Sequence, residues 1–205
     1  MRDLAAVADL APGRGILVMP KVDDAEEIRI AEAVLAEGGA VPRIVALIET
    51  LRGVQAAPAI AAASPLVAGL LFGGVDLAAE LGVEVAEEPL RHARARVVHA
   101  AHAAGVEAMD VPCLDVRAPA VTEDEARAAR RIGFTGKAAI HPVQVGPIHA
   151  AFTPTPEEAA GAARVVAAYR DSDGGLAVLD GRLVERPVAR RAERVLARAR
   201  AAGVA

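Results

Sequence analysis

The strongest constraint on the fold is a repeated alternation of short apolar runs with longer amphipathic stretches. Five apolar runs occur, at 15–20, 43–49, 67–72, 106–111 and 137–141. The stretches between them have helical spacing and several end at glycine, as where Ile28, Ala31 and Leu35 share a face before Gly38. Near-continuous apolar strands that alternate with helices favour an α/β fold with a parallel sheet.

Capping signals place several of the predicted helices. The helices cover roughly 24–37, 52–63, 87–104, 122–132, 155–169 and 187–202. Thr122 with Glu125 has the spacing of a capping box, and Thr155-Pro156 with Glu158 repeats it. A short hairpin is predicted over 176–184, around Asp180-Gly181.

This pattern predicts two parts. Residues 1–170 form the sheet-and-helix domain, and residues 171–205 form a hairpin-and-helix appendage. We find no low-complexity linker before about residue 171.

Composition excludes several classes of protein. The net charge is −4 and aromatic residues make up 2% of the chain, so we expect no nucleic-acid partner. The single Cys113 cannot form an internal disulfide, and we expect a cytoplasmic protein in which this thiol is buried. Residues 54–75 carry no charge, but their two prolines and Gly-Gly pair favour a buried helix, turn and strand over a membrane span.

Two carboxylates follow neighbouring apolar runs. Glu49 ends the second run, and Asp76 comes just after the third, in FGGVDL. In a parallel α/β layout both lie at the carboxyl ends of strands, where the sites of such folds are built. One or two carboxylates are what Mg²⁺ takes from a protein, so the pair predicts a metal site. The alternative is that Glu49 caps a helix and Asp76 is the N-cap of a helix over 77–81.

The two lysines form a second set of candidates. The chain has 21 arginines but only Lys21 and Lys137, and both lie at strand-associated positions. Lysine and arginine are not interchangeable in binding sites, so this usage suggests a function, although chance remains an alternative. His141 precedes Pro142 and is either a site residue or a buried, hydrogen-bonded histidine. Asp110 ends a strand and is a candidate for organising the loop that follows.

Taken together, the motifs resemble one known family. The strings PKVDDAEEI, IVALIETLRGV, LLFGGVDLAAELG, AMDVP, GFTGKAAIHPVQVGPIHAAFTPTPEE and DGRLVERPVARRAERVL follow one another as in citrate lyase β subunit-like proteins. These are the CitE-like branch of the HpcH/HpaI aldolase superfamily. The resemblance covers nearly the whole chain.

The resemblance implies a fold, a cofactor and a reaction. The fold would be a TIM (β/α)8-type barrel, usually found in trimers, with Mg²⁺ held by Glu49 and Asp76. The reaction would be cleavage of a β-hydroxyacyl-CoA, of the citryl-, malyl- or citramalyl-CoA type, into an acyl-CoA and a 2-oxo acid.

The resemblance also implies further site residues. Glu185 stands where the family has an aspartate that reaches a neighbouring subunit's site and transfers a proton. The residues expected to bind substrate are Gly73, Gly74, Lys137, Ile140, His141 and Pro142.

The chain departs from the family pattern at its start. Relatives begin with three more strands, which carry a CoA-contacting stretch, an acidic element and a substrate-binding arginine. About five strands are predicted here, so we expect an incomplete barrel with two exposed sheet edges. The chain would be a fragment or a mis-started reading frame, or pair with a chain that supplies the missing strands, or be a degenerate relative. Two alternative functions follow, a non-catalytic protein that keeps metal or CoA binding and a class II aldolase that acts on free 4-hydroxy-2-oxo acids.

Overall fold

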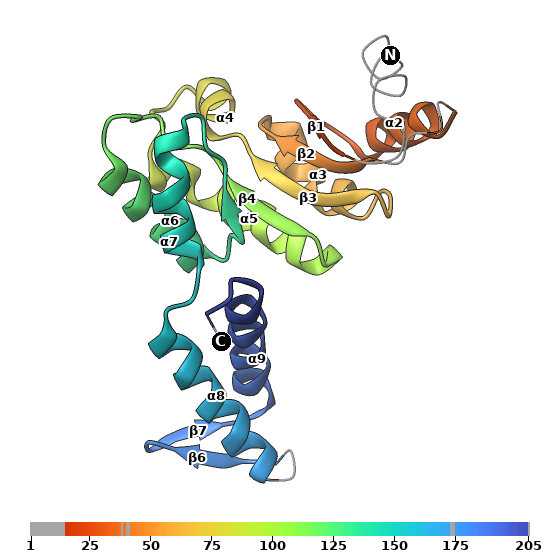
Figure 1. Cartoon of the computed structure of the whole chain (residues 1–205). Coiled ribbons are helices and arrows are strands. Elements are labelled where there is room, and N and C mark those ends of the chain that lie inside the picture. Colours follow the sequence, from red (N-terminus) through yellow and green to blue (C-terminus); the bar gives the residue numbers. More distant parts are fainter. Residues whose placement is uncertain (1–14, 38, 40–41, 173–174, 205) are drawn as a thin grey trace. The chain divides into compact units, whose positions relative to one another are not determined.

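A computed structural model describes residues 15–37, 39, 42–172 and 175–204 (Figure 1). The chain divides into two compact units, residues 1–148 and 149–205, and we describe each by itself. The second unit begins before the appendage predicted at 171, because the helix that starts at Pro156 packs on the last helix of the chain. The prediction that residues 1–170 form the barrel domain and residues 171–205 an appendage stays a prediction.

The first unit is built on a five-stranded parallel sheet. Its strands are β1 (Ile16–Met19), β2 (Arg43–Ile48), β3 (Val67–Phe72), β4 (Glu107–Asp110) and β5 (Gly136–Lys137). They lie side by side in sequence order, as in a barrel of βα units, and β1 and β5 are the edges. Figure 1 labels β1 to β4 of this sheet. Over the described residues the sheet is therefore an open segment of a barrel.

Helices cover one face of this sheet. They are α2 (Ala25–Glu37), α3 (Leu51–Ala61), α4 (Gly74–Leu81), α5 (Glu87–Ala104) and α6 (Pro119–Ile132). The chain continues through a 3₁₀ turn, η1 (Pro142–Gln144), into α7 (Val145–Phe152). Under the helices, Ile44, Ile48, Leu70, Phe72 and Ala108 are fully buried.

The opposite face of the sheet is less covered. Leu47, Leu71 and Met109 are in register across β2, β3 and β4, and each is only half-buried. Because successive strand residues point to opposite faces, Glu49 shares this face with Leu47, whereas Asp110 shares the helix-covered face with Ala108. This alternation decides where each candidate site residue lies.

The second unit is a helix pair with a hairpin. It holds α8 (Pro156–Asp171), β6 (Ala177–Leu179), β7 (Arg182–Val184) and α9 (Arg186–Ala201). Ala162, Val166 and Ala192 form its small core. The capping box at Thr155 and Glu158 is confirmed, and Asp180-Gly181 forms the predicted hairpin turn with positive φ at both residues.

Two local predictions are corrected by the structure. Helix α6 begins at Pro119, one turn before the predicted capping box, because a proline in the first turn starts a helix well. Thr122 is consequently inside the helix, where its buried hydroxyl has no hydrogen-bond partner. The fifth strand ends at Lys137 rather than at His141, because the chain turns there toward η1.

The uncharged stretch at 54–75 forms the predicted helix, turn and strand. It contains most of α3, a turn and β3. Across the described residues, no helix has both the length and the apolar character needed to cross a membrane.

Candidate metal and substrate site

Glu49 lies at the carboxyl end of β2 and points away from the helix layer. The residue that caps α3 is its neighbour Thr50, whose hydroxyl accepts a hydrogen bond from the Gly53 N–H at 2.9 Å. The alternative that Glu49 caps a helix is therefore wrong. Glu49 is 7% exposed, and its carboxylate accepts a hydrogen bond from the Lys21 backbone N–H at 2.9 Å.

Asp76 lies in the first turn of α4, directly after β3. The N-cap of α4 is Gly73, so the alternative of an N-cap aspartate is also wrong. About half of the Asp76 side chain is exposed, and the Lys21 ammonium lies 3.6 Å from its Oδ1 atom. Both predicted metal ligands are thus in contact with the same lysine.

A glycine lets the two carboxylates approach each other. A Cβ atom on Gly73 would lie 2.3 Å from the Glu49 Cβ and 3.0 Å from its Oε2 atom. The Gly73 N–H donates to the Ile48 carbonyl at 2.9 Å, which joins the ends of β2 and β3. Any larger residue at position 73 would displace Glu49.

Burial and charge act on Glu49 together. Burial raises the pKa of Glu49 above its ordinary value, and the negative charge of Asp76 raises it further. The Lys21 N–H bond and the Lys21 charge act in the opposite direction. The carboxylate therefore gains from any additional cation placed beside it.

A cavity of about 330 Å³ opens beside the two carboxylates. Its wall includes Leu47, Glu49, Leu71, Gly73, Asp76, Val111, Pro112 and Ile140. We call it the Glu49 cavity. It is apolar except for the two carboxylates, as expected of a site that holds a small ligand by a few polar groups.

The donor set suits a hard divalent cation. Among the described residues, no third Asp, Glu, His or Cys joins Glu49 and Asp76 in a group that could hold a metal. Mg²⁺ commonly takes only one or two carboxylates and fills its remaining positions with water and substrate oxygens. The nearby Lys21 ammonium already marks the position as one that attracts a cation.

Lys137 lies on the other face of the sheet. Its side chain is 1% exposed, and its ammonium is 3.0 Å from Asp110 Oδ2 and 3.1 Å from Glu125 Oε2. Arg94 of α5 adds a third contact, 3.0 Å from the same Asp110 oxygen. These four residues, which we call the Asp110 cluster, line a separate cavity of about 250 Å³ under the helices.

The remaining predicted wall residues are divided between these regions. Ile140 lines the Glu49 cavity, whereas Gly74 packs toward Phe72 and Leu90. His141 is exposed, and its Nδ1 atom accepts the Val143 N–H at 3.2 Å as the cap of η1. It is therefore not a buried histidine. Pro142 is the first residue of η1 and is exposed.

Gln144 is a structural residue that our sequence analysis missed. It is fully buried, donates to the Cys113 carbonyl at 2.8 Å and accepts the Ile140 N–H at 2.9 Å. Its amide thus ties the loop after β4 to the loop after β5. Both loops supply wall to the Glu49 cavity. The only signal in the sequence was a glutamine two residues after Pro142.

Glu185 belongs to the second unit. It is the N-cap residue of α9, but its side chain makes no capping hydrogen bond. The carboxylate is exposed. Its role as a proton-transfer group stays a prediction.

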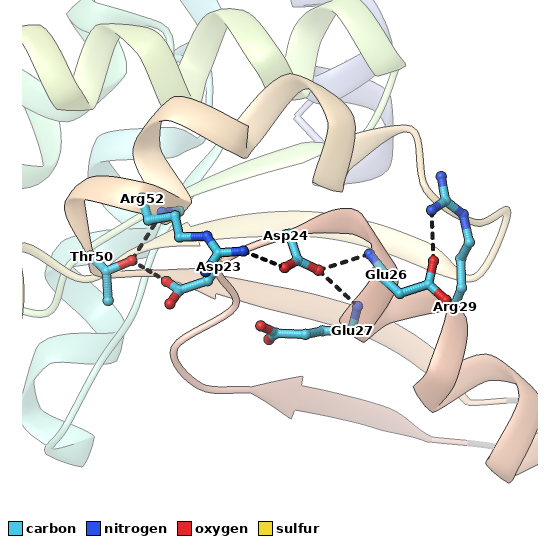
Figure 2. A network of polar contacts seen from close by, with 8 residues as sticks. Asp23, Asp24, Glu26, Glu27, Arg29, Thr50 and Arg52 are labelled. Atoms are coloured by element: carbon cyan, nitrogen blue, oxygen red, sulfur yellow. Dashed lines mark hydrogen bonds and ion pairs between the residues drawn. The ribbon is translucent and has the colours of Figure 1, made fainter.

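The segment that carries Lys21 is held by a polar network (Figure 2). Asp24 accepts the backbone N–H groups of Glu26 and Glu27 at 3.0 and 3.2 Å, and so caps α2. Its other oxygen pairs with Arg52 of α3 at 2.8 Å. Asp23 accepts a hydrogen bond from the Thr50 hydroxyl, which joins the same segment to the residue after Glu49.

Comparison with known proteins identifies the family. A model described as HpcH/HpaI aldolase/citrate lyase matches residues 2–142, and one described as a C–C bond lyase of the TIM-barrel fold matches residues 90–204. The chain belongs to the HpcH/HpaI aldolase/citrate lyase family. It is by family a carbon–carbon lyase, and the predicted TIM-barrel class is confirmed.

Individual relatives agree with this assignment. The chain is 36% identical to a citrate lyase subunit beta-like protein of Mycobacterium tuberculosis, over 97% of this chain and 71% of that one. It is 34% identical to citrate lyase subunit beta of Escherichia coli, over 100% and 71%. A crystal structure of CitE from M. tuberculosis with magnesium, acetoacetate and coenzyme A matches with a TM-score of 0.79 and 33% identity, over 97% of this chain and 72% of that one.

Proposed function

We propose that this protein is a Mg²⁺-dependent lyase that cleaves a β-hydroxyacyl-CoA into an acyl-CoA and a 2-oxo acid. The observation that carries the proposal is the pair of carboxylates, Glu49 and Asp76, beside one cavity at the carboxyl ends of adjacent strands. The M. tuberculosis relative, crystallised with magnesium, acetoacetate and coenzyme A, supports the same cofactor and substrate class.

The reaction breaks one carbon–carbon bond. The β-hydroxyl loses its proton and becomes the carbonyl of the 2-oxo acid, while the bond between this carbon and the α-carbon of the thioester breaks. The electron pair passes to the α-carbon, and the resulting CoA-ester enolate takes up one proton.

Residues of this chain divide the work. Glu49 and Asp76 would hold the ion, which when bound supplies Lewis-acid stabilisation of charge on the oxo-acid oxygens. Ile140 and the other apolar residues form the wall of the cavity. Gly73 keeps space beside Glu49. Gly74, Lys137, His141 and Pro142 remain predicted substrate-binding residues, although the structure describes Lys137 in a different cavity.

Glu185 is the proposed proton donor to the enolate, acting on the site of a neighbouring subunit in a homo-oligomer, which we propose is a trimer. The family has aspartate at this position, and a misplacement of about 1 Å can cost roughly a hundredfold in rate. We therefore expect Glu185→Gln to abolish proton transfer and Glu185→Asp to retain or increase turnover. Equal rates for both variants would contradict the role.

The test is a substrate panel with the purified chain. Citryl-, malyl- and citramalyl-CoA are incubated with Mg²⁺, and the 2-oxo acid is detected after derivatisation. We expect release from at least one thioester and none in EDTA. Cleavage of free 4-hydroxy-2-oxo acids but not of thioesters would support the aldolase alternative. Binding of Mg²⁺ or acetyl-CoA without any turnover would support the non-catalytic one.

A further inference from the structure

Lys21 has an unusual backbone conformation. Its φ is 50°, and among the described residues only Asp180 is another non-glycine residue with positive φ. Asp180 occupies a hairpin turn in which this conformation is expected. Lys21 follows a strand and precedes a helix, so no hairpin accounts for it. Strained backbone of this kind tends to occur at functional sites when the surrounding structure enforces it.

The surrounding contacts enforce this conformation on both sides. The Lys21 N–H donates to Glu49 at 2.9 Å, and the next N–H, of Val22, donates to the Leu47 carbonyl at 3.3 Å. Asp23 and Asp24 then bind Thr50 and Arg52 of the next βα unit (Figure 2). The backbone at position 21 is thus fixed, and only the side chain is free to move.

That side chain is placed between the proposed metal site and solvent. The ammonium lies 3.6 Å from Asp76 Oδ1, and two thirds of the Lys21 side chain is exposed. An exposed pair at this distance is weak, so the ammonium can leave Asp76 at little cost. An arginine would bind a carboxylate through a rigid two-pronged fork, which is harder to displace. This difference gives a physical reason for a lysine here in a chain with 21 arginines.

We propose that Lys21 is a resident cation of this site with two alternating partners. Without a divalent ion, its ammonium balances the charge of Asp76. With the ion bound to Glu49 and Asp76, the ammonium turns to a carboxylate oxygen of the 2-oxo acid. The second half rests on the proposed function, and the first half requires only that a metal binds at this pair.

The first experiment measures metal affinity alone. Mg²⁺ is titrated into the wild type and into Lys21→Met by calorimetry, with no substrate present. Removal of a competing cation should tighten Mg²⁺ binding by about twofold to fivefold, the range that an exposed ion pair corresponds to. A purely structural role for Lys21 would weaken binding instead. Unchanged or weaker Mg²⁺ binding by Lys21→Met would overturn the resident-cation role.

The second experiment measures binding of a 2-oxo acid. Pyruvate and oxaloacetate are titrated into Mg²⁺-saturated wild type and Lys21→Met. Loss of a charged hydrogen-bond donor should weaken both by roughly tenfold, and their neutral amides should bind the two proteins equally. Equal affinity of the acids for wild type and variant would overturn the carboxylate contact while leaving the first result intact.

Two variants control for indirect effects. Lys21→Gly keeps the backbone N–H to Glu49 but relieves the positive φ, so it should match Lys21→Met in Mg²⁺ binding if only the ammonium matters. Arg29→Met removes a cation that pairs with Glu26 on the exposed side of α2 and should change neither titration. If Glu49→Gln binds Mg²⁺ as well as the wild type does, the proposed metal site itself fails, which is a result separate from any effect of Lys21.

Discussion

Each face of the central sheet carries carboxylates in contact with a lysine, but on one face the lysine is exposed and on the other it is buried. On one face, Glu49 and Asp76 contact a single exposed lysine and border an open cavity. On the other face, Asp110 is 1% exposed and pairs with both Lys137 and Arg94 at 3.0 Å. Both groups lie at the carboxyl ends of strands, where a site is expected.

The difference lies in how far the charges are satisfied within the chain. In the Asp110 cluster two cations converge on one carboxylate oxygen, so the cluster is balanced without any ligand. Asp110 Oδ1 and Arg94 Nε nonetheless remain without a hydrogen-bond partner. At Glu49, burial and a neighbouring carboxylate leave negative charge that the chain only partly balances. Incompletely balanced charge that faces a cavity is typical of functional sites, whereas a buried charge that is already paired is needed mainly so that its partner is not left buried and unpaired.

The largest expected effect is on activity, from Glu49→Gln. Removing one of two proposed metal ligands should lower kcat/KM for the thioester by at least about a hundredfold. Even mutation of residues that only hydrogen-bond to metal ligands typically lowers metal affinity or activity by about 10–100-fold. The melting temperature should not fall, because no balanced ion pair is broken. Glu107→Gln, at the opposite end of β4 and exposed, is the matched control and should keep full turnover. Turnover by Glu49→Gln at the wild-type rate would show that Glu49 does not hold a metal that the reaction needs.

The next largest effect is on stability, from Lys137→Met. It leaves Asp110 buried with one fewer cation, and breaking such a pair costs about 3–5 kcal/mol. Urea unfolding should show this loss, while Mg²⁺ affinity of the folded variant should stay unchanged. A variant of wild-type stability with a raised KM would instead place Lys137 among the substrate-binding residues, as the family resemblance predicts.

Gln144→Leu should affect both properties moderately. The Cys113 carbonyl and the Ile140 N–H would each lose a partner, which costs about 1–3 kcal/mol for a buried group. Because the two loops form wall of the Glu49 cavity, KM should rise while Mg²⁺ affinity is unchanged. Gln55→Leu, on the exposed side of α3, is the control and should leave both properties as they are. A fall in Mg²⁺ affinity would contradict a role confined to the wall.

The smallest effect is a pH dependence of stability. The folded-state pKa of Glu49 is raised, so the folded protein holds this proton more tightly than the unfolded chain does. The unfolding free energy contributed by Glu49 therefore falls as pH rises from about 4.3 through the raised pKa, and it is constant above. Glu49→Gln has no titrating carboxyl at this position. Its unfolding free energy, measured by urea unfolding at several pH values, should therefore rise relative to that of the wild type across the same pH window. A difference that falls with rising pH would show that the pKa of Glu49 is shifted in the opposite direction.

Much of this arrangement was predictable from local sequence patterns. The apolar runs predicted the five strands and a parallel sheet, and glycines at 105 and 133 marked the ends of α5 and α6. The pairing of Glu49 with Asp76 followed from their positions after adjacent strands. The start of α6 was missed because proline and a capping box compete as initiation signals within one turn, and the order of preference depends on what the helix packs against.

The rest depended on register and on distant contacts. The family resemblance implied one site that includes both Lys137 and Ile140. A strand alternates its side chains, however, and the ladder that pairs Asp110 with Lys137 sets Lys137 on the helix side. The sequence around Gln144 gave almost no indication of its structural role, because the carbonyl that its amide binds lies 31 residues away in the chain. Lys21 drew attention only as a rare lysine.

The sequence alone therefore determined the family, the βα order and the two carboxylates that hold the proposed metal site. Each of these rests on residues close together in the chain or on periodicity, and both are properties of local structure. Only the tertiary structure decided which charges are balanced by neighbours and which remain available to a ligand. That distinction depends on which face of the sheet each side chain occupies and on what packs against it from elsewhere in the chain.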